Sequence, residues 1–230
     1  MLAAITAGHG PEGFDAAVVL DADGHASSFL DDAYWALLSK VATGKSIAIL
    51  WNGNQHNAGF LLAHEPPFRV LHGGSLPSGD GVWLPRQLLR EYWKPSFDEL
   101  RAALPGLTSV ATVYLVGTPP PKSQALIRSV IEREPFFVEQ AASLKVDLAD
   151  LRVTEPSTRL AMWEILQEML QECAAEFGAL FIPVPGDVMD ADGILLPRYG
   201  SDDATHGNAD YAARLWKEVA AAMREMESAS

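Results

Sequence analysis

The sequence lacks most of the features that would tie it to an oxidising compartment or to a membrane. Its single cysteine, Cys173, allows no disulfide within the chain. Cys173 lies in an apolar helical pattern, so we expect a small buried side chain and not a nucleophile. No run approaches the roughly 18 apolar residues of a membrane helix. The N-terminus, Met1-Leu-Ala-Ala, has no basic segment and no long apolar core, which predicts no secretory signal and a cytoplasmic protein.

Basic residues are scarce relative to acidic ones. The chain has 17 Lys and Arg against 30 Asp and Glu, a formal net charge of -13. Such a charge repels phosphate backbones and anionic lipid surfaces, so we expect neither nucleic acid nor a membrane as a partner. An oligomeric state is not predicted by this pattern.

Motifs for cofactors and metals are also missing. No Gly-x-Gly-x-x-Gly follows a strand, and Thr43-Gly44-Lys45-Ser46 is the tail of a P-loop without its upstream glycine. The histidines lack the short paired spacings of zinc sites: His9, His25, His64 and His72 are scattered. We therefore expect no cofactor and no metal.

What is present is a chain of 230 residues in which 48% are apolar, enough for one domain, residues 1–230, with a sizeable core. Short apolar runs alternate with amphipathic patterns, which predicts an α/β fold with a mostly parallel sheet and helices on both faces. A broken, Pro- and Gly-rich stretch at 63–86 predicts a long surface excursion without regular structure, which either lies near a site or is only a loop. Expected strands are 14–20, 46–51, 109–116 and 179–184. The first expected helix begins at Asp31 or Asp32 and ends at Gly44, and a second spans 96–104. A third runs from a cap at Ser157 or Thr158 to Gly178, and the last covers 211–226.

A candidate acid–base pair stands in the polar loop before the last helix. Asp203 and His206 are three positions apart, close enough for the carboxylate to hold the imidazole Nδ1 proton and leave Nε2 free as a base. The simpler alternative is that Asp203 or Thr205 only caps the helix that follows.

The surrounding stretch, residues 186–212, resembles the closing block of SGNH (GDSL-like) hydrolases and acyltransferases. In that family an Asp-x-x-His pair ends the loop after the last strand, and an Asn and an aromatic residue often follow it. Here Asp203, His206, Asn208 and Tyr211 fill those places. The resemblance implies a three-layer sandwich with a flavodoxin-like sheet, and ester hydrolysis or acyl transfer on a small acyl ester, for example an acetylated carbohydrate.

Trp51-Asn-Gly-Asn-Gln-His-Asn57, at the end of an expected strand, resembles a second block of the family, Gly-x-Asn-Asp. The sequence departs from that block, because Gly53-Asn54-Gln55 is similar to its Gly-Asn-Glu variant. The resemblance gives Asn54 the role of a side-chain donor to the oxyanion, and a carboxamide at a strand end suits that task physically. The alternative is an Asx-turn made by a loop Asn. For His56 we favour a turn residue over a site residue, and Asn52 and Asn57 have the same status.

The family's first block, Gly-Asp-Ser with the nucleophilic serine, does not occur in this chain. Its nearest counterpart is Ala22-Asp23-Gly24-His25, with glycine in place of serine. Ser27 and Ser28 are the closest hydroxyl groups, although both also fit a loop or a first helical turn. Two explanations stay open: the sequence lacks the family's first strand, or the protein is a catalytically inactive SGNH-like binding or accessory domain.

Overall fold

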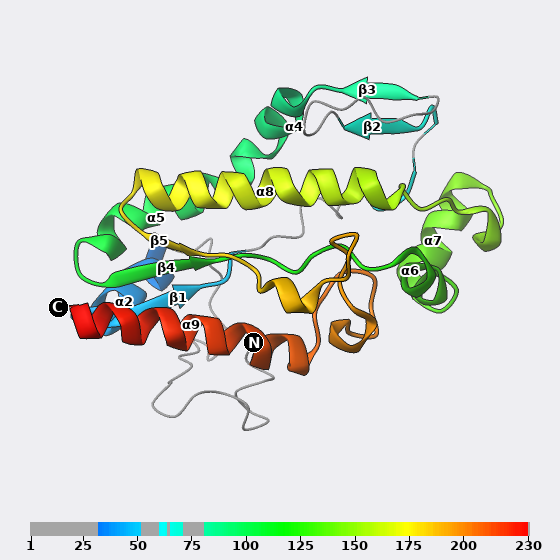
Figure 1. The fold of residues 1–230 in the computed structure, drawn as a ribbon. Coiled ribbons are helices and arrows are strands. Elements are labelled where there is room, and N and C mark those ends of the chain that lie inside the picture. Colours follow the sequence, from blue (N-terminus) through cyan, green and yellow to red (C-terminus); the bar gives the residue numbers. More distant parts are fainter. Residues whose placement is uncertain (1–31, 52–59, 64, 71–80, 230) are drawn as a thin grey trace.

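The computed structural model of the protein describes residues 32–51, 60–63, 65–70 and 81–229. The predicted strand at 14–20 and the candidate residues Ser27, Ser28 and Asn54 lie outside these ranges, as do His56, Asn52 and Asn57. The described part is a mixed α/β structure in which small parallel sheets pack against helices (Figure 1).

The central sheet contains β1 (Ser46–Ile49), β4 (Thr112–Val116) and β5 (Leu180–Ile182), in the order β1-β4-β5 with parallel pairing throughout. In the register, Ile47 lies beside Val113, and Tyr114 lies beside Leu180. All of these strands were predicted, but each is shorter than its apolar run. Before β4, for example, the Val110 N–H still bonds the Leu107 carbonyl at the end of the preceding helix.

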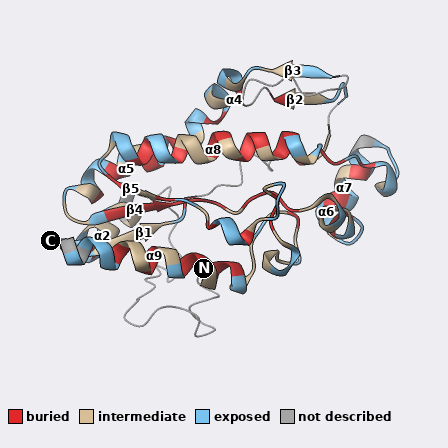
Figure 2. Ribbon diagram, in the orientation of Figure 1, coloured by how far each residue is buried: buried red, intermediate tan, exposed pale blue. Residues whose placement is uncertain are grey.

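Helices cover both faces of this sheet because β4 sends alternate side chains to opposite sides. Val113 and Leu115 pack in a hydrophobic cluster with α5 (Asp98–Thr108) and α8 (Pro156–Glu176). Tyr114 and Val116 pack in a second cluster with α9 (Ala209–Ala229). Figure 1 shows α8 and α9 running on opposite sides of the strands, and Figure 2 shows β4 buried along most of its length.

The long helix α8 begins earlier than predicted. Its N-cap is Glu155, without a side-chain cap hydrogen bond, and Pro156 occupies the first turn. The predicted caps Ser157 and Thr158 are therefore wrong, because a proline's fixed φ and missing N–H suit the first helical position. Ala161, Met162 and Ile165 are all buried, because α8 packs on the sheet and also contacts α4 and β2.

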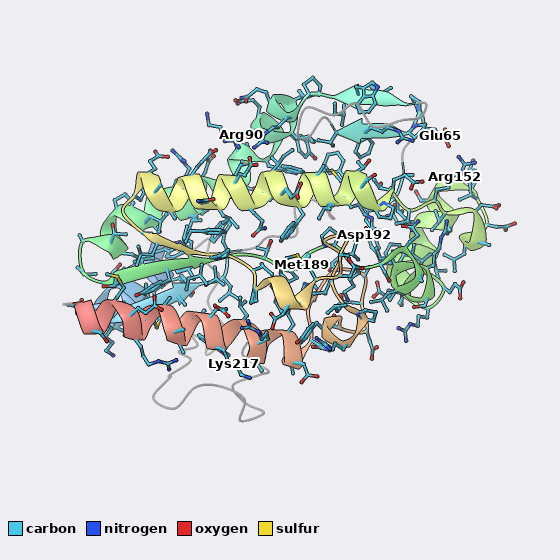
Figure 3. The ribbon with its side chains drawn as sticks, viewed as in Figure 1. Glu65, Arg90, Arg152, Met189, Asp192 and Lys217 are labelled. Carbon is cyan, nitrogen blue, oxygen red and sulfur yellow. The ribbon has the colours of Figure 1, made fainter. Side chains whose placement is uncertain are left out.

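The prediction that residues 63–86 have no regular structure is also wrong. β2 (Phe68–Val70) and β3 (Val82–Leu84) form a two-stranded parallel sheet, with Phe68 beside Val82 and Val70 beside Leu84. Three-residue strands are too short to produce a readable alternation, and tertiary packing decides them. An ion pair between Arg152 and Glu65 joins the chain before β2 to the chain before α8 (Figure 3).

The remaining elements are helices of 11 residues or fewer. Within the described ranges no helix is both long and apolar enough to span a membrane. Gly44 follows the first helix with φ +71°, a left-handed conformation that suits glycine, so the predicted stop is confirmed. The elements are α2 (Asp32–Ala42), α4 (Arg86–Trp93), η1 (Lys94–Phe97), α6 (Gln124–Ile131), α7 (Pro135–Leu144), η2 (Leu148–Asp150), η3 (Gly186–Val188) and η4 (Pro197–Tyr199).

Candidate functional site

The candidate site lies in the loop between β5 and α9, which starts at the carboxyl end of the sheet. Met189 and Asp192 mark this loop in Figure 3. Its last part closes on itself: the Ser201 N–H donates to the His206 carbonyl at 3.0 Å, and the Asn208 N–H donates to the Tyr199 carbonyl at 2.8 Å. Residues 200–207 are thus a compact unit whose ends are held together.

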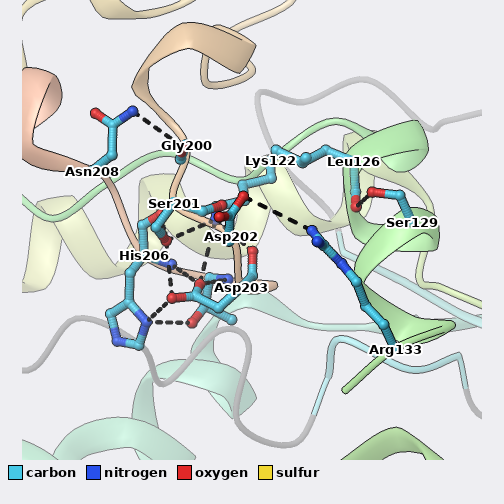
Figure 4. A network of polar contacts seen from close by, with 11 residues as sticks. Lys122, Leu126, Ser129, Arg133, Gly200, Ser201, Asp202, Asp203, His206 and Asn208 are labelled. Atoms are coloured by element: carbon cyan, nitrogen blue, oxygen red, sulfur yellow. Dashed lines mark hydrogen bonds and ion pairs between the residues drawn. The ribbon is translucent and has the colours of Figure 1, made fainter.

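Asp203 organises this unit through both of its carboxylate oxygens (Figure 4). Oδ1 accepts the backbone N–H groups of Thr205 and His206, each at 2.7 Å. Oδ2 lies 2.9 Å from the Nδ1 of His206 and accepts the Ser201 hydroxyl at 2.9 Å. One oxygen therefore fixes the backbone under the histidine while the other holds its ring.

This geometry determines which nitrogen of His206 carries the proton. A carboxylate only accepts hydrogen bonds, so Nδ1 must donate and Nε2 of the neutral ring is left with a free lone pair. The His206 side chain is 68% exposed, and no hydrogen bond from a described residue reaches Nε2. The ring of His206 is thus held in one orientation, with Nε2 open to an incoming group.

The helix cap after this loop belongs to a different residue than expected. Asn208 accepts the Tyr211 N–H at 3.0 Å, directly before α9 begins at Ala209. Its amide also donates to the Arg198 carbonyl at 2.7 Å and to the Gly200 carbonyl at 3.1 Å. The alternative that Asp203 or Thr205 caps α9 is therefore wrong, because both precede the helix start by several residues.

A buried lysine contacts the loop that carries Asp203 and His206. The sequence did not indicate it as a site residue. Lys122 follows β4 and is 1% exposed. Its Nζ donates to the Ser201 carbonyl at 2.9 Å and to the Asp203 carbonyl at 2.5 Å, and lies 3.3 Å from Asp203 Oδ1. Burial lowers the pKa of Lys122, and the neighbouring carboxylate of Asp203 opposes that shift.

The same contacts control the charge of Asp203. Partial burial acts to raise its pKa, but the N–H groups of His206 and Thr205, the Ser201 hydroxyl and Lys122 outweigh it and hold the pKa well below its usual range. Asp203 is therefore ionised at neutral pH, as a partner for an imidazolium must be.

Arg159 of α8 secures the segment that carries Lys122. It is completely buried, and its guanidinium donates to the Lys122 carbonyl at 2.8 Å and to the Thr154 carbonyl at 2.9 Å. A further bond of 3.2 Å reaches Gln124 Oε1, and burial lowers the Arg159 pKa to about 10. Ser123 caps α6 by accepting the Leu126 N–H.

A cavity of about 330 Å³ lies beside the end of β5, separate from the Asp203–His206 pair. Trp163 and Gln167 line it from α8, and both are tied to Thr118 at the end of β4: the Trp163 N–H donates to the Thr118 carbonyl at 2.9 Å. Gln167 exchanges hydrogen bonds with the Thr118 N–H and hydroxyl. The other lining residues are Glu164, Glu168, Gln171, Phe181, Pro183 and Val184.

The structure brings Asp203 and His206 together as their spacing suggested. Searches of protein-family models, curated proteins and solved structures found no match. The catalytic roles of these residues, and that of Asn54 outside the described ranges, stay predictions. Across the described ranges, no cluster of three or more His, Cys, Asp or Glu side chains is arranged to hold a metal ion.

Proposed function

We propose that this chain is an SGNH-like esterase or acyl-transfer enzyme acting on a small acyl ester. The observation that carries the proposal is the contact of 2.9 Å between Asp203 Oδ2 and His206 Nδ1, which leaves Nε2 open as a base. An oriented, exposed imidazole next to an ionised carboxylate is the proton-transfer half of a nucleophilic triad.

In this mechanism His206 Nε2 removes the proton of a serine hydroxyl as its oxygen attacks the acyl carbon. The imidazolium that forms is stabilised by the carboxylate of Asp203. His206 then returns the proton to the leaving alkoxide, and the acyl group stays on the serine until water or an acceptor alcohol removes it. Asn54 would donate a side-chain N–H to the developing oxyanion.

The order of the central strands supports this proposal. In a flavodoxin-like sheet with strand order 2-1-3-4-5, the last three strands are neighbours in sequence order, and they are parallel. β1, β4 and β5 have that arrangement. The Asp203–His206 loop follows the last of them, and Trp51, which opens the block containing Asn54, follows the first.

The nucleophile in this proposal is a serine other than Ser201. The Ser201 hydroxyl donates to Asp203 Oδ2 and lies 2.8 Å from the His206 carbonyl. It therefore contacts the carboxylate of Asp203 and the backbone of His206, and not the Nε2 that would act as the base. Ser27 and Ser28 remain the candidates from the sequence, and both lie outside the described residues.

The proposal is tested by steady-state hydrolysis of p-nitrophenyl acetate by the wild type and by His206→Gln. We expect kcat/KM to fall by about a thousandfold or more, the effect of removing a triad base. Asp202→Asn is the matched control, because Asp202 is adjacent to Asp203 but fully exposed, with only a long ion pair of 3.9 Å to Arg133. Hydrolysis by His206→Gln at the wild-type rate would exclude the proposed role.

A second candidate is an SGNH-like domain that binds its ligand without turnover. The absence of Gly-Asp-Ser from the sequence favours it. For this candidate we expect an acetylated oligosaccharide to bind in calorimetry while no acetate is released over hours. Release of acetate that depends on His206 would reject it.

A further inference from the structure

Lys122 holds the candidate loop by charged hydrogen bonds and not by packing alone. Its ammonium is buried, and the hydrogen bonds that it donates end on the loop that carries Asp203 and His206. Both of its shortest bonds reach backbone carbonyls, those of Ser201 and Asp203. A charged donor on a carbonyl fixes the loop backbone more firmly than a neutral one would.

The position of the Asp203 side chain follows from that of its backbone. With its carbonyl bonded to Lys122, and with Oδ1 bound to the N–H groups of Thr205 and His206, the carboxylate has its orientation set from both ends. Oδ2 then lies 2.9 Å from His206 Nδ1 and accepts the Ser201 hydroxyl at 2.9 Å.

Lys122 is itself held from behind. Arg159 donates to its carbonyl at 2.8 Å, and Ser123, the next residue, caps α6. A continuous series of contacts thus connects α8, through Arg159, Lys122 and Asp203, to His206. Figure 4 shows the last part of this series, with Lys122 reaching into the loop from one side and His206 projecting from the other.

We propose that Lys122 is a positioning residue that keeps the proton of neutral His206 on Nδ1 by fixing Asp203. Its catalytic consequence rests on the proposed esterase function, whereas its effect on the histidine tautomer does not. Without Lys122 the Ser201 and Asp203 carbonyls lose their cationic donor, and the loop that holds Asp203 relaxes. The His206 ring then samples the Nε2–H form, in which Nε2 cannot act as a base.

The test is Lys122→Met, whose unbranched side chain reaches as far as Cε but lacks the charged Nζ. Long-range ¹H–¹⁵N spectra of histidine-labelled protein, recorded where the ring is neutral, report the tautomer of His206, and His206→Gln identifies its signals. We expect the Nδ1–H form to dominate in the wild type and to fall to a minority in Lys122→Met. Arg133→Met is the matched control: Arg133 pairs with exposed Asp202, so its loss leaves the tautomer unchanged.

The same variants are assayed for ester hydrolysis, where Lys122→Met is expected to lose at least tenfold in kcat with little change in KM. Circular dichroism and a cooperative urea transition check that Lys122→Met folds. If it does not, Lys122→Gln replaces it, and the same loss of the Nδ1–H form is expected.

The outcomes separate the two proposals. A folded Lys122→Met that keeps the wild-type tautomer overturns the positioning role, whatever its activity. A wild type that hydrolyses no ester while Lys122→Met still changes the tautomer refutes the proposed function and supports the positioning role.

Discussion

Replacing Asp203 by alanine is expected to destabilise the protein much more than the same change at Asp202. The two residues are neighbours in one loop with the same charge. Asp203 accepts two backbone N–H groups at 2.7 Å and contacts Lys122 and His206, whereas Asp202 is fully exposed and has one long ion pair. The pair of variants thus isolates these contacts from the effect of removing one acidic charge.

The magnitude follows from the hydrogen bonds that are lost. Each backbone N–H left without its carboxylate costs about 1 kcal/mol, because the site is partly open to water. The contact between Asp203 and Lys122 adds roughly 0.5–1 kcal/mol once solvent screening is allowed for, since the Asp203 side chain is 37% exposed. We therefore expect a loss of about 2–3 kcal/mol, or roughly 4–12 °C in Tm for a chain of this size. Asp202→Ala should change stability by less than about 0.5 kcal/mol.

The free energy of unfolding that Asp203→Ala loses must also depend on pH in a defined direction. The folded-state pKa of Asp203 is lowered from its ordinary value of 3.8, so its contribution to stability is fully present above that value and is lost as pH falls below it. Urea unfolding of the wild type and both variants at pH 7 and at pH 3 measures this. The gap between wild type and Asp203→Ala should narrow at pH 3. A gap that widens, or equal penalties for the two variants at pH 7, would refute the reasoning.

Two further predictions concern residues beyond the pair. Burial raises the pKa of Cys173 to about 11. A disulfide reagent at pH 8 should therefore leave this thiol unmodified in the native protein and label it fully in guanidinium. The intact mass of the protein measures both results. Gly207→Ala would place a Cβ 2.5 Å from the ring of buried Tyr211. We therefore expect the free energy of unfolding, measured in urea, to fall by about 1–3 kcal/mol. An unchanged urea transition would contradict the close packing at the start of α9.

The sequence predicted the strongly patterned elements. β1, β4 and β5 follow from short apolar runs, and α8 and α9 from long apolar stripes, because these patterns reflect burial directly. β2 and β3 were missed because each spans three residues, too few for a readable alternation, and forms through pairing with a segment 14 positions away. Strand order also depends on such pairing, which periodicity does not encode.

The candidate site was predicted where its parts are local. Asp203 and His206 are three residues apart, so spacing alone could bring them together. Lys122 was not predicted as a site residue, because its bonds to Ser201 and Asp203 cross 79 and 81 positions of the chain. The signal that could have found it is its position shortly after β4, because sites in parallel sheets lie outside the carboxyl ends of the strands.

The proposed esterase function requires that His206 activates a serine of this chain. It is tested most directly by the intact mass of the purified protein after incubation with a fluorophosphonate, which reacts with activated serines. We expect one adduct on the wild type, mapped by peptide analysis to a serine such as Ser27 or Ser28, and none on His206→Ala. No adduct on the wild type, or equal labelling of both proteins, would contradict it.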